Sequence, residues 1–201
     1  PTIRALTRAS RAFFEAPPAG FAAAPLLSPR GAMYVGTPAQ RSMLDTFAAE
    51  LAPLAPTLRR LSAAEAIERV PVLRPDQVGG AVLDPEATDL DVSALHQGFL
   101  RQAKAHSAQL VCDARIEAIE RDTTGWRLRT VADEWRAAIV VNAAGAWADR
   151  LAVLASLPPI VLQPKRRAAF LFAPPPDVDS TRWPCVCGVD EDEGWYFKPD
   201  A

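Results

Sequence analysis

The sequence predicts a mixed α/β fold on three observations. First, an apolar run at 137–141 passes through small residues into helix formers, as a buried parallel strand does when it turns tightly into a helix. Second, residues 91–106 place apolar side chains at helical spacing behind a capping residue. Third, alternating segments at 115–121, 126–131 and 135–138 predict an antiparallel meander. The 201 residues suffice for one large domain or two small ones.

The turn after the apolar run has a geometry that suits nucleotide binding. Ala143, Ala144 and Gly145 carry little or no side chain, so a ligand can approach the backbone closely. The free N–H groups at the start of the following helix can face a phosphate. The same turn is also common in α/β proteins that bind nothing there, so both interpretations stay open at this point.

Composition excludes several classes of protein. Hydrophobic residues make up 49% and charged residues 23%, which is typical of a folded globular chain. The net charge of -2, without a basic stripe, argues against a nucleic-acid partner. No apolar run approaches the roughly 18 residues of a transmembrane segment. Three cysteines fit a reducing compartment, so we expect a cytoplasmic protein or one peripheral to the inner membrane.

The first half of the chain alternates helix and strand signals. An amphipathic segment predicts a helix at 3–14, and a strand is expected at 32–36. A proline in the first turn opens a helix at 38–51. A capping box opens a short helix at 62–70, and a further strand is expected at 79–83. The predicted buried face of the helix at 38–51 comprises Met43, Leu44, Phe47 and Leu51.

The second half begins with the helix capped by Asp91 or Ser93. Its predicted buried stripe comprises Leu95, Phe99, Leu100 and Ala103. Besides the meander and the apolar run, the pattern predicts further strands at 109–112, 160–162, 167–172, 185–189 and 195–198. The three prolines at 174–176 predict a stiff loop between the last two groups of strands.

Several motifs in this order resemble the FAD-dependent oxidoreductases of the D-amino-acid oxidase and glycine oxidase group, and within it the bacterial D-arginine dehydrogenases. The resemblance covers nearly the whole chain. The motifs that carry it are Pro17-Pro18-Ala19-Gly20-Phe21, Pro25-Leu26-Leu27-Ser28-Pro29-Arg30, Leu95-His96-Gln97-Gly98, Val140-Val141-Asn142-Ala143-Ala144-Gly145-Ala146-Trp147, Leu162-Gln163-Pro164-Lys165-Arg166-Arg167 and Ala173-Pro174-Pro175-Pro176.

The resemblance implies FAD as cofactor and a fold in two interleaved parts. A Rossmann-like FAD-binding domain, incomplete in this chain, would comprise residues 1–25 and 85–157. A substrate domain with a mainly antiparallel sheet would comprise 26–84 and 158–201. The glycine-rich G-x-G-x-x-G turn of the family is absent from this sequence. We therefore expect the chain to correspond to the central part of a longer enzyme, and to bind FAD poorly by itself.

The resemblance also assigns residues to the cofactor. Ile116 would rest against the adenosine part of FAD. The strand-to-helix turn would line the cofactor through Ala143, Ala144, Gly145 and Trp147.

For the substrate, the resemblance aligns Arg167 with an arginine that pairs with the substrate carboxylate, work that suits a planar guanidinium. Tyr196 matches a tyrosine whose hydroxyl holds the substrate. The alternatives are a solvated strand edge for Arg167 and a half-buried strand aromatic for Tyr196. Ala32 stands where D-arginine dehydrogenases carry a glutamate that meets the substrate guanidinium. The absence of this glutamate predicts a preference for neutral D-amino acids.

No side chain is a convincing catalytic base, since the hydride chemistry would belong to the flavin. His96 and His106 fit structural or exposed positions on their helix. Cys185 and Cys187 share one face of a regular strand, and with Cys112 far away in sequence they are too few for a metal site.

The resulting prediction is a bacterial flavoprotein of amino-acid catabolism that oxidises D-amino acids, neutral ones in preference to D-arginine, to imino acids and 2-oxo acids. Two alternatives remain. One is a sarcosine- or glycine-oxidase-like amine oxidase, which differs in substrate and in whether oxygen or a respiratory acceptor takes the electrons. The other is a non-catalytic interaction module that keeps the fold without FAD.

Overall fold

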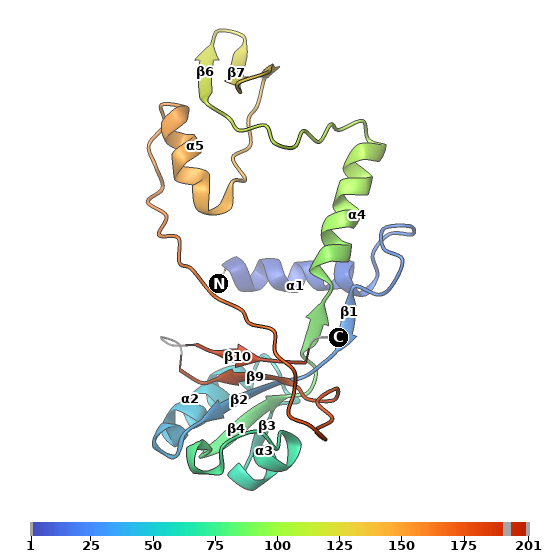
Figure 1. Cartoon of the computed structure of the whole chain (residues 1–201), viewed down its shortest axis with the longest axis vertical. Coiled ribbons are helices and arrows are strands. Elements are labelled where there is room, and N and C mark those ends of the chain that lie inside the picture. Colours follow the sequence, from blue (N-terminus) through green and yellow to red (C-terminus); the bar gives the residue numbers. More distant parts are fainter. Residues whose placement is uncertain (1, 191–193, 200–201) are drawn as a thin grey trace. The chain divides into compact units, whose positions relative to one another are not determined.

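The computed structural model describes residues 2–190 and 194–199. The chain divides into two compact units (Figure 1). The first comprises residues 1–106 and 173–201, and the second comprises residues 107–172. Each unit is described by itself.

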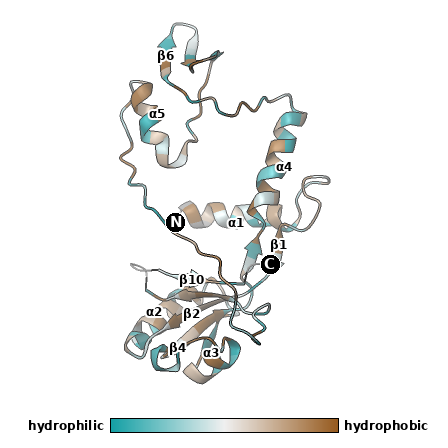
Figure 2. Ribbon diagram, in the orientation of Figure 1, coloured by the Kyte–Doolittle hydropathy of each residue, from teal (hydrophilic) through white to brown (hydrophobic). Residues whose placement is uncertain are grey.

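The first unit is built on a five-stranded sheet with the order β10-β9-β2-β4-β3 (Figure 1). The strands are β2 (Ala32–Gly36), β3 (Arg59–Leu61), β4 (Gly80–Asp84), β9 (Cys185–Gly188) and β10 (Tyr196–Phe197). The pair β2–β9 is parallel, and the other neighbours are antiparallel. Four of these strands were expected from the sequence, whereas β3 was not. Figure 2 shows β2 and β4 in the colour of hydrophobic residues, as expected for the middle of a sheet.

Helices cover both faces of this sheet. On one face Ala66 of α3 (Ala63–Arg69) and Val70, which directly follows this helix, join a buried cluster with Met33 and Val186. On the other face α2 (Arg41–Leu51) places the fully buried Leu44 against Val82. The predicted helix at 38–51 is therefore present, with a 3-10 turn, η1 (Pro38–Gln40), as its first part. Its predicted apolar face is only partly buried, because Met43 is 43% exposed.

Local capping begins two of the helices as predicted. Ser62 and Glu65 form both hydrogen bonds of the capping box at the start of α3. Asp91 accepts a hydrogen bond of 2.7 Å from the backbone N–H of Ala94 and so caps α4 (Val92–Ala105). Just before it, β5 (Thr88–Leu90) pairs with β1 (Leu27–Pro29) in a two-stranded ladder that the sequence pattern did not predict.

The first helix, α1 (Thr2–Glu15), matches its prediction, and its aromatic residues join those that follow. The ring of Phe13 lies 4.9 Å from that of Phe21 and 5.6 Å from that of Phe99, centroid to centroid. The prediction of Phe99 in the buried stripe of this helix was wrong, since 54% of Phe99 is exposed and Gly98 is the buried residue of α4.

The second unit contains the predicted meander. Strands β6 (Ala118–Asp122), β7 (Gly125–Arg129) and β8 (Glu134–Ala137) pair in sequence order, all antiparallel. A 3-10 turn, η3 (Gly145–Trp147), leads into α5 (Ala148–Leu154). Glu120 of β6 forms ion pairs with two arginines of β7, Arg127 and Arg129. The hydrogen bond from Arg127 lowers the pKa of Glu120. The meander therefore carries its own ion-pair network.

Four predicted strands are wrong for this structure. The segments 109–112, 137–141, 160–162 and 167–172 form no strand beyond the end of β8 at Ala137. Ile139 is 78% exposed, Val141 82% and Phe170 82%. An apolar run becomes a strand only when a neighbouring strand supplies hydrogen-bond partners. The described part of the chain pairs none with these segments.

Within the described residues, no helix combines the length and the apolar character that crossing a bilayer requires.

Candidate functional site

A cavity in the second unit brings predicted cofactor residues together. Its volume is about 350 Å³, and it is lined by Arg115, Ile116, Ala144, Trp147, Arg150, Leu151 and Leu154. Three of the five residues assigned to the cofactor from the sequence are on this lining. The other two, Ala143 and Gly145, flank Ala144 in the chain. Residues nearly 40 positions apart thus converge on one hollow.

The turn beside the cavity is held by Asn142. Its side-chain N–H donates to the backbone carbonyl of Ala148 at 2.8 Å, and its side-chain oxygen, Oδ1, accepts from the backbone N–H of Ala144 at 3.3 Å. Gly145 has a φ of 55°, the left-handed region that favours glycine, and a Cβ there would meet nothing within 4 Å. The sequence analysis included Asn142 in the motif at 140–147 but gave its side chain no role, although asparagine ahead of small residues is a known turn signal.

The cavity lining can hold an aromatic ring next to an anionic group. Ile116, Leu151 and Leu154 give an apolar wall, and the indole of Trp147 offers a flat surface. Arg115 and Arg150 add guanidinium groups, which recognise phosphate well. The volume lies at the lower end of the range of small-molecule sites, enough for part of a dinucleotide. The residues present therefore fit the nucleotide portion of FAD.

In the first unit, two predicted substrate residues share one face of the sheet. Ala32 lies opposite Cys185 in the β2–β9 ladder, and Tyr196 lies opposite Cys187 in the β9–β10 ladder. Directly paired residues point to the same face, and so do alternate residues of one strand. Ala32, Tyr196 and both cysteines therefore belong to one face, with Ala32 partly buried and Tyr196 59% exposed.

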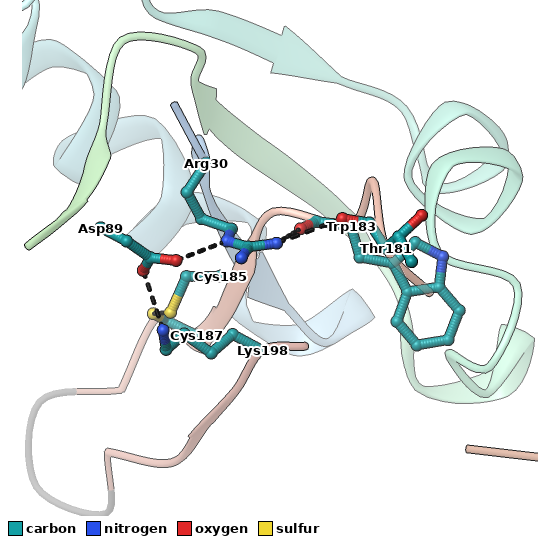
Figure 3. Close-up of polar contacts among 7 residues, drawn as sticks. All are labelled: Arg30, Asp89, Thr181, Trp183, Cys185, Cys187 and Lys198. Atoms are coloured by element: carbon teal, nitrogen blue, oxygen red, sulfur yellow. Dashed lines mark hydrogen bonds and ion pairs between the residues drawn. The ribbon is translucent and has the colours of Figure 1, made fainter. Parts of the chain in front are cut away.

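A partly buried ion-pair network adjoins this face (Figure 3). Arg30 Nε donates to Asp89 at 2.8 Å, and Lys198 Nζ donates to the same carboxylate at 3.0 Å. Arg30 also donates to the carbonyls of Thr181 and Trp183, at 3.3 and 3.4 Å. Burial alone would raise the pKa of Asp89, but the hydrogen bonds from the two cations outweigh it and lower that pKa. The network joins four separate segments, and sequence reasoning missed it because no local pattern signals it.

Arg167 lies in the second unit, exposed and in a stretch without strand structure. The start of that stretch is anchored by Asp149 of α5. Its carboxylate accepts the N–H of Ile160 at 2.9 Å and that of Leu162 at 2.7 Å. His96 and His106 are exposed, as expected. Among the residues that the structure describes, no three His, Cys, Asp or Glu side chains gather as a metal site would require.

The structure is thus a mixed α/β protein, and its second unit carries a cavity whose lining fits part of a dinucleotide. Comparison with protein families agrees, because the model of the family described as "FAD dependent oxidoreductase" (DAO) matches residues 2–201. The chain therefore belongs to this family of FAD-dependent oxidoreductases, and its cofactor is FAD.

Solved structures show the same fold. Glycine oxidase from Geobacillus kaustophilus is 24% identical with a TM-score of 0.59, over 75% of this chain and 40% of that one. Glycine oxidase from Bacillus cereus is 18% identical with a TM-score of 0.63, over 75% and 43%. L-proline dehydrogenase from P. horikoshii is 18% identical with a TM-score of 0.60, over 92% and 47%. The chain thus spans less than half the length of each of these proteins.

Proposed function

We propose that this chain takes part in the FAD-dependent oxidative deamination of D-amino acids to imino acids and 2-oxo acids, with neutral side chains preferred over D-arginine. The observation that carries the proposal is the cavity at which Ile116, Ala144 and Trp147 meet. In this proposal residues 1–25 and 85–157 contribute to the cofactor part of the family fold. Residues 26–84 and 158–201 contribute to the substrate part.

Around the cofactor, Trp147 and Ile116 would flank its adenosine part, while Arg115 and Arg150 would face its phosphates. Ala143, Ala144 and Gly145 would let the backbone approach it closely. When bound, FAD supplies the acceptor for the hydride of the substrate α-carbon. The share of this chain is to position the cofactor and the substrate, so no side chain here is assigned as an acid or a base.

On the substrate side, Arg167 would hold the carboxylate through two parallel hydrogen bonds, and the Tyr196 hydroxyl would add a further one. Ala32 itself has no carboxylate with which to bind the cationic side chain of a substrate such as D-arginine. A lost charge-assisted hydrogen bond is worth about 1.5–3 kcal/mol, which disfavours D-arginine by roughly ten- to a hundredfold or more.

Anaerobic bleaching of the flavin by single amino acids tests this proposal. Neutral D-amino acids such as D-alanine and D-methionine should reduce the flavin faster than D-arginine does, and L-enantiomers should not reduce it. The A32E variant should shift the preference back toward D-arginine. Rapid reduction by D-arginine in the wild-type protein, ahead of every neutral substrate, would contradict the preference.

A second candidate is an amine oxidase that acts on glycine or sarcosine. Two of the structural neighbours are glycine oxidases, which is the reason to consider this candidate. Their sequence identities of 18–24% establish a shared fold and not a shared substrate. The same panel separates the candidates, since glycine and sarcosine would then bleach the flavin and bulkier D-amino acids would not. Consumption of oxygen, or of a quinone analogue, would identify the electron acceptor.

A further inference from the structure

Two cysteines of β9 form a thiol pair that the proposed reaction does not use. The Sγ atoms of Cys185 and Cys187 lie 3.8 Å apart, on the same side of the strand (Figure 3). Both side chains are partly buried. The alternation of a regular strand predicts this shared face, and the structure confirms it. The third cysteine, Cys112, is exposed and belongs to the other unit.

The sheet holds this pair in place. Cys185 is paired with Ala32 of β2, and Cys187 is paired with Tyr34 of β2 and with Tyr196 of β10. Since β9 has a neighbour on each side, its backbone cannot bend without loss of ladder hydrogen bonds. Alternate residues of a strand have Cα atoms about 6.6–6.8 Å apart, at the upper limit for a disulfide. The fold therefore favours two separate thiols over a direct bond between them.

We propose that Cys185 and Cys187 form a two-thiol site that captures a trivalent arsenical. With an arsenoxide, R–As=O, each sulfur forms one As–S bond. The As=O bond breaks, and its oxygen leaves as one water with the two thiol protons. No atom is oxidised or reduced, so the step needs no further reactant. A bridging arsenic atom joins the sulfurs without requiring them to approach to bonding distance.

The surroundings favour this ligand over a divalent metal ion. Burial, together with the neighbouring thiol of Cys185, raises the pKa of Cys187 to about 12, so the thiol stays protonated near neutral pH. A metal dication would require both thiols to lose their protons. The arsenical adduct carries no charge and buries none. Structural zinc also requires four protein ligands, and the part of the chain that the structure describes gathers no such set.

The site is on the face of the sheet that carries Ala32 and Tyr196. An adduct on the two sulfurs therefore lies beside both residues and narrows the space above them. This inference does not depend on the proposed function, because capture requires neither FAD nor turnover.

Titration of the purified full chain with phenylarsine oxide tests the site. Native mass spectrometry should show one tightly bound adduct with loss of one water, and Ellman's reagent should count two fewer free thiols in the denatured adduct than in the denatured free chain. A dithiol should remove the arsenical, whereas a monothiol in excess should not. Because the second bond is intramolecular, C185S and C187S should each weaken binding by about a hundredfold or more.

The C112S variant is the matched control and should bind the arsenical like the wild-type chain. Circular dichroism of C185S and C187S verifies that the sheet is intact, and C185A and C187A serve if a serine variant does not fold. Peptide mapping of the wild-type adduct adds a readout that needs no variant. Unchanged affinity in the folded Cys185 and Cys187 variants, loss of binding in C112S, or an adduct mapped outside 185–187 would overturn the proposal.

Discussion

Gly98 of α4 lies directly against the ring of Phe21. A Cβ atom at position 98 would be 2.5 Å from Cζ and 2.8 Å from Cδ1 of that ring, far inside ordinary contact distance. The ring of Phe21 is only 2% exposed and also packs edge-on against Phe13 and Phe99. A glycine in the middle of a helix, ordinarily unfavourable, is thus explained by the close approach of an aromatic ring.

The variant G98A should therefore destabilise the protein, by about 1–3 kcal/mol as for other overpacked sites. In an open helix the same change would stabilise it by about 1 kcal/mol, so the sign of the effect is diagnostic. Urea unfolding followed by circular dichroism measures the difference. Q97A, at the exposed neighbouring position, is the control and should change the free energy of unfolding by less than about 0.5 kcal/mol. A stabilised G98A would show that the ring does not contact α4.

The Asp89 network predicts a pH dependence. The pKa of Asp89 is lowered in the folded state, so its carboxylate stabilises the fold fully above the unfolded value near 3.8. That contribution is lost as the pH falls through the lower, folded pKa. D89N should therefore be less stable than wild type at pH 7, by about 1–3 kcal/mol. The difference should begin to shrink only below about pH 4.

Unfolding of wild type and D89N at pH 7, 5 and 3.5 measures this dependence. Asp45, whose side chain is 67% exposed in its pair with Arg60, provides the matched control. D45N should cost less than about 1 kcal/mol, as surface ion pairs do. A gap between D89N and wild type that widens on acidification would contradict the assignment.

The hydrogen bonds accepted by Asp149 predict slow amide exchange at two positions of the second unit. D149A removes the acceptor for the N–H groups of Ile160 and Leu162, and both amides should then exchange with solvent faster. D149N keeps one acceptor oxygen and should give an intermediate rate. Hydrogen exchange read by NMR or mass spectrometry resolves the three proteins. Equal exchange rates of the amides at 160 and 162 in all three proteins would show that these hydrogen bonds to Asp149 do not form.

The features that could be predicted from the sequence are those that depend on residues close to one another in the chain. The capping box joins Ser62 and Glu65, three positions apart, and the meander joins neighbouring segments, so both were predicted correctly. The runs at 137–141 and 167–172 were not, because a strand needs a partner that its own residues do not specify. The contact of Arg30 with Asp89 joins positions 59 apart, beyond any local pattern. Ile116 and Trp147 could be linked to one cofactor only through the family resemblance, which the family match supports.

Binding of FAD to the purified chain and to two single variants bears on the cavity itself. A144R places a long side chain in the lining, whereas A146R changes an exposed neighbour that is not part of it. We expect saturable quenching of flavin fluorescence by wild type and A146R, with A144R at least about tenfold weaker, a difference of roughly 1.4 kcal/mol. Equal affinity in all three proteins would contradict the assignment of this cavity to FAD.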